Sequence, residues 1–399
     1  MTELGPLPEE WQVMQLGEVT KMQQGKVLSR NKFTKSGYPV FGANGQIGWY
    51  HTFTHEESEV LVTCRGATCG TINISPPRSF ITNNAMVVTP SVPNLTKQFL
   101  AFALTYFDVR KAITGTGQPQ ITKATLSICH IPLPPLPEQQ AIAHVLRTVQ
   151  RAKEATERVI AALKELKKSL MRHLFTYGPV PIDQADRVPL KDTEIGPIPE
   201  HWEVMRLGEV AKHRSILIDP RDFPELPYVG LEHINPGEIK IRVWGYGAQV
   251  RSAKTRFFPG DILYGKLRPY LDKAALAQFD GMCSTDILVI SANKQKISAE
   301  FLAYTFHTIR FLAYATSTMT GVNHPRTSWT ALSKCFIPLP PLPEQQAIAD
   351  ILRTVDRRIE AEENRKRALE ALFKTLLHHL MTGKVRVKDL AAVDAEVAV

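Results

Sequence analysis

A nineteen-residue segment that occurs twice constrains the fold of this chain more than any other feature. The chain has IPLPPLPEQQAIAHVLRTV from Ile131 and IPLPPLPEQQAIADILRTV from Ile337, so the copies lie 206 residues apart and differ at two positions. A second pair, GPLPEEWQVMQLGEV from Gly5 and GPIPEHWEVMRLGEV from Gly196, lies 191 residues apart. Chance does not produce such agreement. The chain is therefore an internal duplication with extra residues in one half, and two copies are too few for a solenoid.

Each half places a diverged insert between its two repeated segments, at residues 20–130 and 211–336. Short β-type runs bounded by Gly, Asn and Pro occur in both, such as EVLVTCRG and AMVVTP, then GDILYGKL and STDILVISA. Each insert also has a helical pattern, KQFLAFALTYFDVRKAI from Lys97 and AEFLAYTFHTIRFLAYA from Ala299. At an offset of 202, DILYGK aligns with EVLVTC and STDILVI with TNNAMVV. We therefore expect two copies of one α/β fold with a partly antiparallel sheet.

A long helix is expected after each proline-rich segment, because the prolines hold the lead-in extended and helical periodicity follows at once. The first runs from about Leu136 to Phe175, with a heptad stripe that also takes in Thr156 and the row Val145, Ala152, Val159 and Leu166. The second runs from Leu342 to Met381 and includes Ile351 and Leu372. A helix of about 60 Å cannot bury such a stripe alone. We expect an antiparallel coiled coil with a core of Ile142, Val149, Leu163, Leu170, Ile348, Val355, Leu369 and Leu376; the alternative is two separate helical hairpins.

The predicted fold class is α+β, with two pseudo-symmetric α/β domains separated by two long antiparallel helices. The expected segments are residues 1–130, the first repeated segment with its insert; 131–178, the proline lead-in and first helix; 179–336, a linker with the second repeated segment and insert; 337–383, the second lead-in and helix; and 384–399, a tail.

The net charge of +9 is concentrated in the two inserts. Residues 20–130 carry 11 Lys and Arg against 4 Asp and Glu, and residues 211–336 carry 16 against 10. Two basic modules suit a protein that binds a polyanion at two places; charge that serves only solubility is the alternative. There is no apolar run of membrane-spanning length and no secretory signal, so we expect a cytoplasmic protein and no membrane partner.

The five cysteines are few, odd in number and scattered, which favours reduced thiols. Cys64 and Cys69 form the closest pair, but they lack a second pair or histidines at ligand spacing, so we expect buried thiols and no metal site. The phosphate-binding GxxxxGK[ST], the dinucleotide-binding GxGxxG, a methyltransferase [ND]PP[YF] and HExxH are all absent. Glu238-Ile239-Lys240 has the ExK form of a metal nuclease without an upstream Pro-Asp pair. No catalytic residues are therefore predicted.

The doubled LPPLPEQQAIA followed by a long helix, with GPxPxxWxVxxLGEV before each insert, resembles the specificity (S) subunit of type I restriction-modification systems, from Gly5 to about Gly383. The resemblance implies two target recognition domains, each reading one half of a split sequence in double-stranded DNA, held apart by two conserved helices. It implies no catalysis and no cofactor in this chain. Two modification subunits, which bind S-adenosylmethionine and methylate adenine N6, would dock on it, and restriction subunits using ATP and Mg would join where the system also restricts.

Polar and basic loop residues are the candidates for DNA contact, because Arg and Lys pair with guanine, Asn and Gln pair with adenine, and cations bind phosphate. The loops GTGQPQIT from Gly115 and GVNHPRTS from Gly321 are the favoured units. The first module offers Lys26, Arg30, Asn31, Lys32, Asn44, Gln46, Arg65, Asn83, Asn84, Gln118 and Gln120. The second offers Lys266, Arg268, Tyr270, Lys273, Asn323, His324 and Arg326. For each residue the alternative is an ordinary solvated or turn side chain.

Two functions of other classes remain open at this stage. One insert could carry methyltransferase or nuclease chemistry, which the missing motifs disfavour. The chain could also be a protein scaffold whose basic modules bind acidic partners, which competition by duplex DNA would distinguish from a DNA reader.

Overall fold

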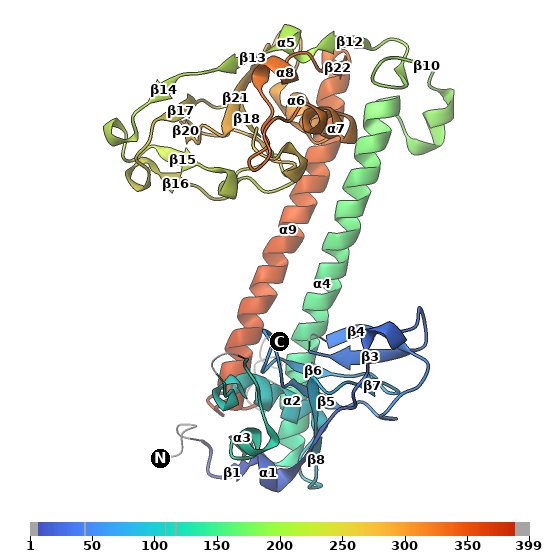
Figure 1. Ribbon diagram of the computed structural model, residues 1–399, viewed down its shortest axis with the longest axis vertical. Coiled ribbons are helices and arrows are strands. Elements are labelled where there is room, and N and C mark those ends of the chain that lie inside the picture. Colours follow the sequence, from blue (N-terminus) through green and yellow to red (C-terminus); the bar gives the residue numbers. More distant parts are fainter. Residues whose placement is uncertain (1–6, 44, 108, 116–117, 388–399) are drawn as a thin grey trace, which may run out of the picture. The chain divides into compact units, whose positions relative to one another are not determined.

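The computed structural model describes residues 7–43, 45–107, 109–115 and 118–387 (Figure 1). The chain divides into two compact units. Unit 1 consists of residues 1–157 and 364–399, and unit 2 of residues 158–363. Within the described residues, none of the helices combines the length and the apolar composition needed to cross a bilayer.

Unit 1 is built on a four-stranded antiparallel sheet. Its strand order is β2 (Thr20–Gln24), β8 (Ala85–Pro90), β5 (Val60–Thr63) and β6 (Ile72–Ile74). A smaller sheet contains β4 (Gly45–Tyr50), β3 (Tyr38–Gly42) and β7 (Phe80–Ile81), with β3 and β7 parallel. Helix α2 (Lys97–Tyr106) begins at Thr96, whose side chain accepts a hydrogen bond from Phe99 N. Shorter elements are α1 (Leu16–Val19), η1 (Arg30–Lys32), η2 (Val109–Ala112) and α3 (Lys123–Ser127).

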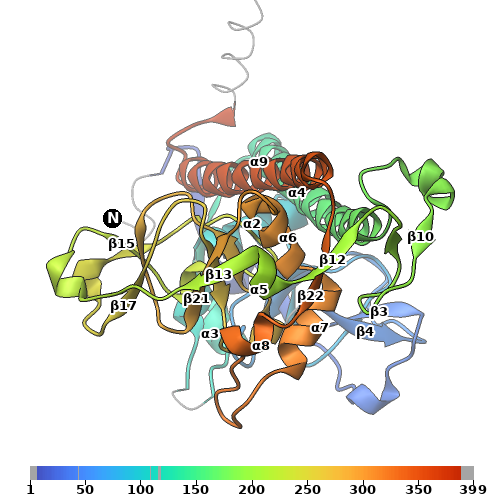
Figure 2. The same cartoon turned by 90° about the horizontal axis from the view of Figure 1, so that it is seen from above.

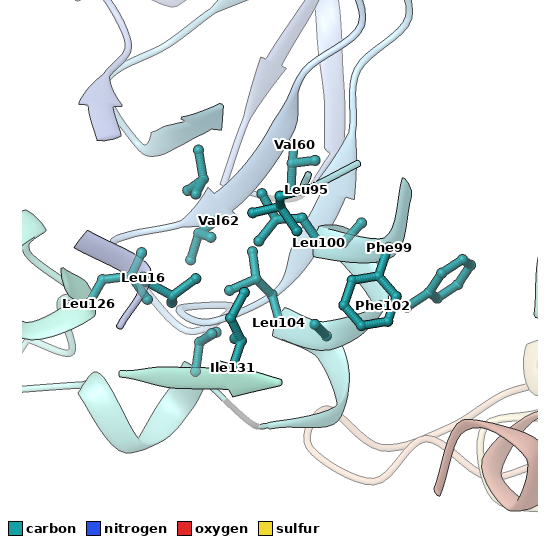
Figure 3. Packing of buried hydrophobic residues seen from close by; sticks show 14 of the residues in the cluster. Leu16, Val60, Val62, Leu95, Phe99, Leu100, Phe102, Leu104, Leu126 and Ile131 are labelled. Carbon is teal, nitrogen blue, oxygen red and sulfur yellow. The ribbon is translucent and has the colours of Figure 1, made fainter. Parts of the chain in front are cut away.

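The central strands are apolar on both faces because each face is covered. Val60 and Val62 of β5 belong to the main core with α2, whereas Leu61 belongs to a second core with Phe41 and Ile81. Figure 3 shows Val60 and Val62 beside Leu100 and Leu104 of α2. A strand buried on both sides is expected to be a continuous run of apolar residues, as VLV is here.

Unit 2 repeats this plan with insertions. Its main sheet has the order β13 (Ala211–Arg214), β21 (Ile287–Ala292), β18 (Ile262–Gly265) and β19 (Ala274–Leu276). Strands β18, β19 and β21 therefore lie 202 residues after β5, β6 and β8, as the aligned motifs predict. The second sheet has the order β14 (Leu217–Ile218), β17 (Lys254–Phe257), β20 (Gly281–Cys283), β15 (Pro227–Val229) and β16 (Gly245–Tyr246). Strands β14 and β17 have no counterpart in the smaller sheet described for unit 1.

The two helical patterns of the inserts are shorter than the sequence predicts. The pattern from Lys97 is a helix only to Tyr106, after which Val109–Ala112 form η2. The pattern from Ala299 is two helices, α6 (Ala299–Phe306) and α7 (Ile309–Ser317). The break in the second is local: the Thr308 side chain accepts from Phe311 N, which caps α7 and turns the chain. The helical spacing of apolar residues continues across this break, so the sequence pattern does not show where α6 ends and α7 begins.

The repeated segments pair with each other in each unit. Strand β1 (Gln12–Gln15) is antiparallel to β9 (His130–Leu133), and β12 (Glu203–Arg206) is antiparallel to β22 (Phe336–Leu339). Figure 2 shows β12 and β22 side by side, next to α5 (Leu207–Val210) and α8 (Trp329–Leu332). The remaining short elements of unit 2 are η3 (Ile182–Arg187), β10 (Leu190–Lys191), β11 (Ile198–Pro199), η4 (Pro220–Asp222), η5 (Leu231–His233), η6 (Gly247–Gln249) and η7 (Pro269–Leu271).

Side chains of the repeated PEQQ explain why this sequence is so similar in both halves. The indole of Trp11 donates to Glu138 at 2.9 Å, and the indole of Trp202 donates to Glu344 at 2.9 Å. The next residues, Gln139 and Gln345, are fully buried and satisfy backbone groups. In unit 2, Gln345 Oε1 accepts from Ser298 N at 2.8 Å, while Nε2 donates to the carbonyls of Lys296 (3.0 Å) and Pro340 (2.8 Å). Gln139 makes the same contacts with Thr96, Asn94 and Pro134.

The two long helices are α4 (Leu136–Tyr177) and α9 (Leu342–Met381), close to the predicted bounds. Gly178 follows α4 in the left-handed conformation, with φ +83°. In unit 2, Lys164 pairs with Glu363 and Lys167 with Asp356; in unit 1, Glu157 pairs with Lys366. In unit 2, residue numbers rise along one helix as they fall along the other, so the two helices are antiparallel there.

The buried row of each helix differs from the predicted one. Of the eight residues expected in the core, Ile142 and Ile348 are buried, and Val149, Leu163, Leu170, Val355, Leu369 and Leu376 are half-buried. The rows beside them contain Leu146, Ile160, Lys167 and Leu174 on α4, and Leu352, Ile359, Glu362 and Leu380 on α9. The inclusion of Val159 and Leu166 in the predicted stripe is wrong, since they are 41% and 46% exposed, and so is that of Ile351 and Leu372, at 36% and 45%.

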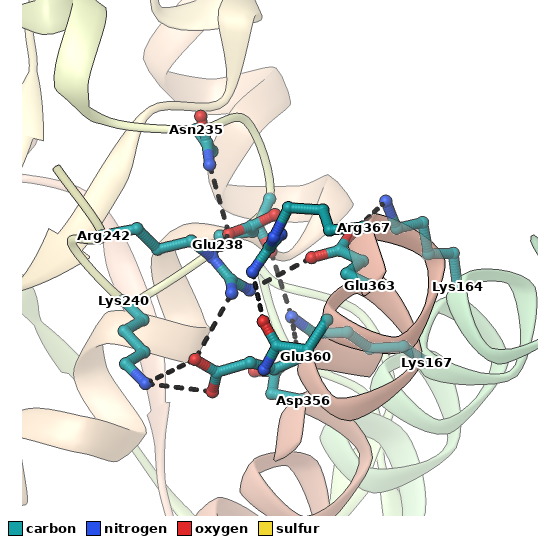
Figure 4. Close-up of polar contacts among 12 residues, drawn as sticks. Lys164, Lys167, Asn235, Glu238, Lys240, Arg242, Asp356, Glu360, Glu363 and Arg367 are labelled. Atoms are coloured by element: carbon teal, nitrogen blue, oxygen red, sulfur yellow. Dashed lines mark hydrogen bonds and ion pairs between the residues drawn. The ribbon is translucent and has the colours of Figure 1, made fainter. Parts of the chain in front are cut away.

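A polar cluster fastens the insert of unit 2 to its helices (Figure 4). The Lys167 ammonium is nearly buried, lies 2.7 Å from Asp356 and donates to the Gly237 carbonyl at 3.0 Å. Tyr304 of α6 donates to the same aspartate at 2.9 Å. Arg242 contacts Glu238, Glu360 and Glu363, and Lys240 contacts Glu360 at 2.7 Å. Charged groups from α4, α9 and the loop 235–242 thus neutralise one another, and α6 adds the hydroxyl of Tyr304.

Candidate nucleic-acid interface

Four segments of unit 1 that are distant in sequence meet at one end of the main sheet. Cys64 N donates to the Asn84 carbonyl at 2.9 Å, and Ile121 N donates to the Cys64 carbonyl at 3.0 Å. Asn83 N donates to the Lys26 carbonyl at 3.0 Å. These bonds join the ends of β2 and β5, the start of β8 and the Gly-polar-Pro loop that the sequence favours. We call this group loop cluster 1, made of residues 24–26, 64–66, 82–84, 114–115 and 118–121.

Unit 2 joins three corresponding segments with equivalent backbone hydrogen bonds. Lys266 N donates to the Asp286 carbonyl at 3.0 Å, and Thr327 N donates to the Lys266 carbonyl at 3.0 Å. Arg268 N donates to the Pro325 carbonyl at 2.8 Å, as Gly66 N does to the Pro119 carbonyl at 3.3 Å in unit 1. The group of residues 266–273, 284–286 and 320–327 is loop cluster 2. The side chains have diverged between the two clusters, whereas the backbone network is kept.

The central strand of each main sheet has an acidic and a basic end. Glu59, just before β5, is buried and pairs with Lys97 at 3.0 Å; Asp261, just before β18, is buried and pairs with Arg214 at 3.0 Å. The opposite ends carry exposed Arg65 and Arg268 within the loop clusters. Since the buried acids are neutralised by their partners, the field of each module favours an anion at the loop cluster.

Loop cluster 1 gathers about half of the residues predicted for the first module. Lys26, Arg65, Gln118 and Gln120 are exposed, and Asn83 and Asn84 are half-buried. Gly25 allows the close approach of this loop to the end of β7, because a Cβ there would lie 2.3 Å from the Thr82 carbonyl oxygen. Other candidates lie elsewhere: Arg30, Asn31 and Lys32 form η1, and Gln46 is exposed on β4. Asn44 is outside the described residues.

Loop cluster 2 contains all seven residues predicted for the second module, in different roles. Arg268, Tyr270, Asn323 and His324 are exposed, and Lys266 is half-buried. The Lys273 ammonium instead donates to the Leu231 carbonyl at 2.6 Å, so it braces the loop. Arg326 is held by Asp286, with Nε 2.9 Å from Oδ1. That hydrogen bond raises the pKa of the guanidinium, which stays protonated.

The backbone of loop cluster 2 has a strained turn. Arg268 and Asp272 have φ values of +51° and +54°, which non-glycine residues adopt rarely. Asp272 is fixed by the buried His307, whose Nδ1 lies 2.7 Å from Oδ1 and whose Nε2 lies 3.0 Å from the Ala274 carbonyl. The strained turn on either side of Tyr270 is thus supported from the core.

Sequence reasoning missed the residues that support the loops. Gln24 donates to the Asn83 carbonyl at 2.8 Å, and Asp286 anchors Arg326, yet neither lies in a Gly-rich or basic motif. Alignment of the two modules could have identified Asp286, because at an offset of 202 residues it aligns with Asn84, a predicted DNA-contact residue.

Among the described residues, the cysteines form no metal site in either loop cluster. All five are free, and among the described residues no group of three or more His, Cys, Asp and Glu is placed to hold a metal ion. Burial raises the pKa of the Cys64 thiol and raises that of Cys335 to about 12, which keeps both protonated.

The comparison with known protein families decides what this duplicated arrangement is. The family described as the type I restriction modification DNA specificity domain matches residues 8–165 and 199–371, which is most of the chain in two copies. The chain belongs to this family. It is a specificity subunit of a type I restriction-modification system with two DNA recognition domains, and such subunits are non-catalytic and act within a larger complex.

Individual relatives agree over most of their length. The EcoDI specificity subunit of Escherichia coli is 28% identical, over 88% of this chain and 82% of its own. The MjaVIII specificity subunit of Methanocaldococcus jannaschii is 27% identical, over 96% of this chain and 95% of its own. Among solved structures, the S subunit of a type I restriction-modification system from M. genitalium has a TM-score of 0.67 at 17% identity, covering 95% of this chain and 99% of that one. This last likeness concerns the fold. The predicted α+β class with an internal duplication is confirmed.

Proposed function

We propose that this specificity subunit reads a bipartite target in double-stranded DNA, one half with each loop cluster. The observation that carries the proposal is the repeated backbone network: both modules present loops of different side chains on the same scaffold at the basic end of the sheet. A shared scaffold with diverged side chains suits two readers of different sequences. Phosphate contacts from cations would position the modules, and amides and guanidinium groups would select bases.

The residues proposed to contact DNA are the exposed and half-buried side chains of the two clusters. In the first module they are Lys26, Arg65, Asn83, Asn84, Gln118 and Gln120. In the second they are Lys266, Arg268, Tyr270, Asn323, His324 and Arg326. Arg30, Asn31, Lys32 and Gln46 remain candidates for contacts outside loop cluster 1. Lys273 would contact DNA only if it released the Leu231 carbonyl.

Two modification subunits are the proposed protein partners. Each unit has its own copy of the paired strands, the proline lead-in and the buried glutamine, so any subunit that recognises one copy finds a second equivalent surface. The adenine N6 methyltransferase activity, with S-adenosylmethionine, would belong to these partners. ATP and Mg would belong to restriction subunits where the system has them. Because chromosomal DNA is the substrate, we place the complex in the cytoplasm.

Mapping of methylated bases tests this proposal. The chain is expressed with the modification subunit encoded beside it in a host that lacks DNA methylases, and the genomic DNA is sequenced by a single-molecule method that detects N6-methyladenine. The expected result is a motif in two parts with a fixed unspecified gap, which disappears when this chain is omitted. A continuous motif, or methylation that persists without the chain, would contradict the proposal.

A further inference from the structure

Gln120 and Arg326 occupy the same place in the two modules. Gln120 forms antiparallel bridges to Arg65 and Thr114, and Arg326 forms them to Leu267 and Thr320. The hydrogen bonds also correspond: Gln120 N donates to the Thr114 carbonyl at 3.0 Å, and Arg326 N to the Thr320 carbonyl at 2.9 Å. With the same bridges on both sides, the Cα–Cβ bonds of the two residues leave the backbone in the same direction relative to their modules.

The two side chains at this place have different hydrogen-bonding patterns. A glutamine amide has one donor and one acceptor edge, which matches N7 and N6 of adenine in the major groove. An arginine guanidinium has two parallel donors, which match O6 and N7 of guanine. The position therefore combines a constant backbone with a variable base preference, as a specificity-determining position requires.

Arg326 is oriented before any DNA arrives. Its Nε donates to Asp286 Oδ1 at 2.9 Å, its Nη2 to Oδ2 at 3.5 Å and its Nη1 to the His324 carbonyl at 3.3 Å. These contacts use three of the five N–H donors of a guanidinium, and 42% of the side chain stays exposed. A guanidinium that is fixed from one side and open on the other loses less entropy when it binds a base.

We propose that residue 326 selects a guanine in the half-site of the second module, and that residue 120 selects an adenine in the half-site of the first. This inference rests on the proposed function, since it assigns bases within a bipartite target. Asp286 is a positioning residue, because it acts on the base through the Arg326 guanidinium. The rival explanation is that Arg326 only ties the loop to Asp286 and touches no base.

The test exchanges the two side chains, in R326Q and Q120R, and maps methylated bases with each variant in the complex described above. R326Q is expected to replace guanine by adenine, or to accept any base, at one position of one half-site, while the other half-site and the gap stay the same. Q120R is expected to replace adenine by guanine in the opposite half-site. The matched control is R221Q, which removes another exposed arginine of unit 2 that pairs with an aspartate, Asp219, and it should leave the motif unchanged.

Loss of the Asp286 carboxylate tests its positioning role, whereas the base change in R326Q is what separates base selection from a loop tie. D286N is expected to keep guanine at the same position but to lower the affinity of the complex for the duplex by about 5- to 100-fold. The inference would be overturned if R326Q methylated the same motif as the wild-type complex. It would also be overturned if R326Q changed both half-sites. If R326Q methylates no genomic site, duplexes randomised over the second half-site are offered to the purified complex: selection of adenine at one position supports the inference, and selection of the original guanine overturns it. A wild-type complex without a bipartite motif would refute the proposed function itself.

Discussion

Single buried residues, more than apolar patterns, explain why the repeated segments of this chain have diverged so little. Gln139 and Gln345 are fully buried, and each satisfies three backbone groups from two different segments. No other side chain has a donor and an acceptor at this reach with this shape, so the identity of the residue is fixed by hydrogen bonding. The sequence shows that PEQQ matters, but it does not show which glutamine is inside, because both are polar and adjacent.

Replacement of Gln345 by leucine should therefore destabilise unit 2. Q345L leaves Ser298 N and the carbonyls of Lys296 and Pro340 without their partner, which should cost about 2–4 kcal/mol of unfolding free energy. The control is Q346L, since Gln346 is exposed and donates to Asp350 on its own helix. Calorimetric melting of the two variants checks this; equal melting temperatures would mean that the buried amide is not required.

Replacement of Gly25 by alanine should impair the first loop cluster by sterics alone. A Cβ at residue 25 would lie 2.3 Å from the Thr82 carbonyl oxygen and 2.5 Å from that of Ile81, so the loop with Lys26 must move. We expect G25A to cost about 1–3 kcal/mol of unfolding free energy and to reduce methylation of every site without changing the motif. Ser29→Ala, in the same loop and exposed, is the control. A G25A variant with normal methylation would show that the loop can shift without effect.

Among the elements, the long helices show where periodicity succeeds and where it fails. Their ends could be predicted, because prolines precede each helix and glycine follows the first. The buried row of side chains could not be predicted, because a row lies on each side of Ile142, Val149, Leu163 and Leu170 and either could have been the buried one. The row with Val159 and Leu166 is more apolar in sequence, yet the row with Ile160 and Lys167 is the buried one. Lys167 can be buried because its ammonium pairs with a carboxylate and donates to a carbonyl. Those partners, Asp356 and Gly237, lie on α9 and in the distant loop 235–242.

The position that Lys167 occupies in unit 2 is occupied by an apolar residue in unit 1. There Phe373 lies 6.1 Å from Phe102 between ring centroids, whereas in unit 2 the corresponding pair is Lys167 over the ring of Tyr304, at 5.6 Å. The loop clusters show a similar limit of sequence reasoning: the favoured loops could be found from their Gly, Pro and amide residues, but Asp286 became meaningful only when the fold placed it beside Arg326.

Removal of the buried ammonium should weaken unit 2 at this contact. K167M leaves Asp356 and the Gly237 carbonyl without their cation and should lower the unfolding free energy by about 2–4 kcal/mol. Lys168→Met is the matched control, because that lysine is 70% exposed and pairs with the exposed Glu165 one turn away; it should change stability by less than about 0.5 kcal/mol. Urea unfolding of both variants measures the difference. A K167M protein as stable as K168M would show that the ion pair merely offsets its own desolvation.

At the scale of the whole molecule, the duplication gives one chain two DNA recognition modules, and each long helix continues from one unit into the other. Each long helix begins in one unit and ends in the other, with 42 residues in α4 and 40 in α9. A continuous helix transmits a change in length without a change in the module at its end. We propose that the length of the helix pair sets the gap of the bipartite target, while the loop clusters set the two half-sites.

A heptad added to both helices should lengthen that gap and nothing else. Duplication of residues 151–157 in α4 and of 364–370 in α9 adds about 10 Å of helix and keeps the buried row in phase, so methylation mapping should find a gap longer by up to about three base pairs. The half-sites should be unchanged, because no loop residue is altered. A heptad in only one helix shifts pairs such as Glu157–Lys366 out of register and should abolish methylation. An unchanged gap with both heptads in place, or new half-sites, would mean that the spacing is set by the partner subunits instead of by the helices.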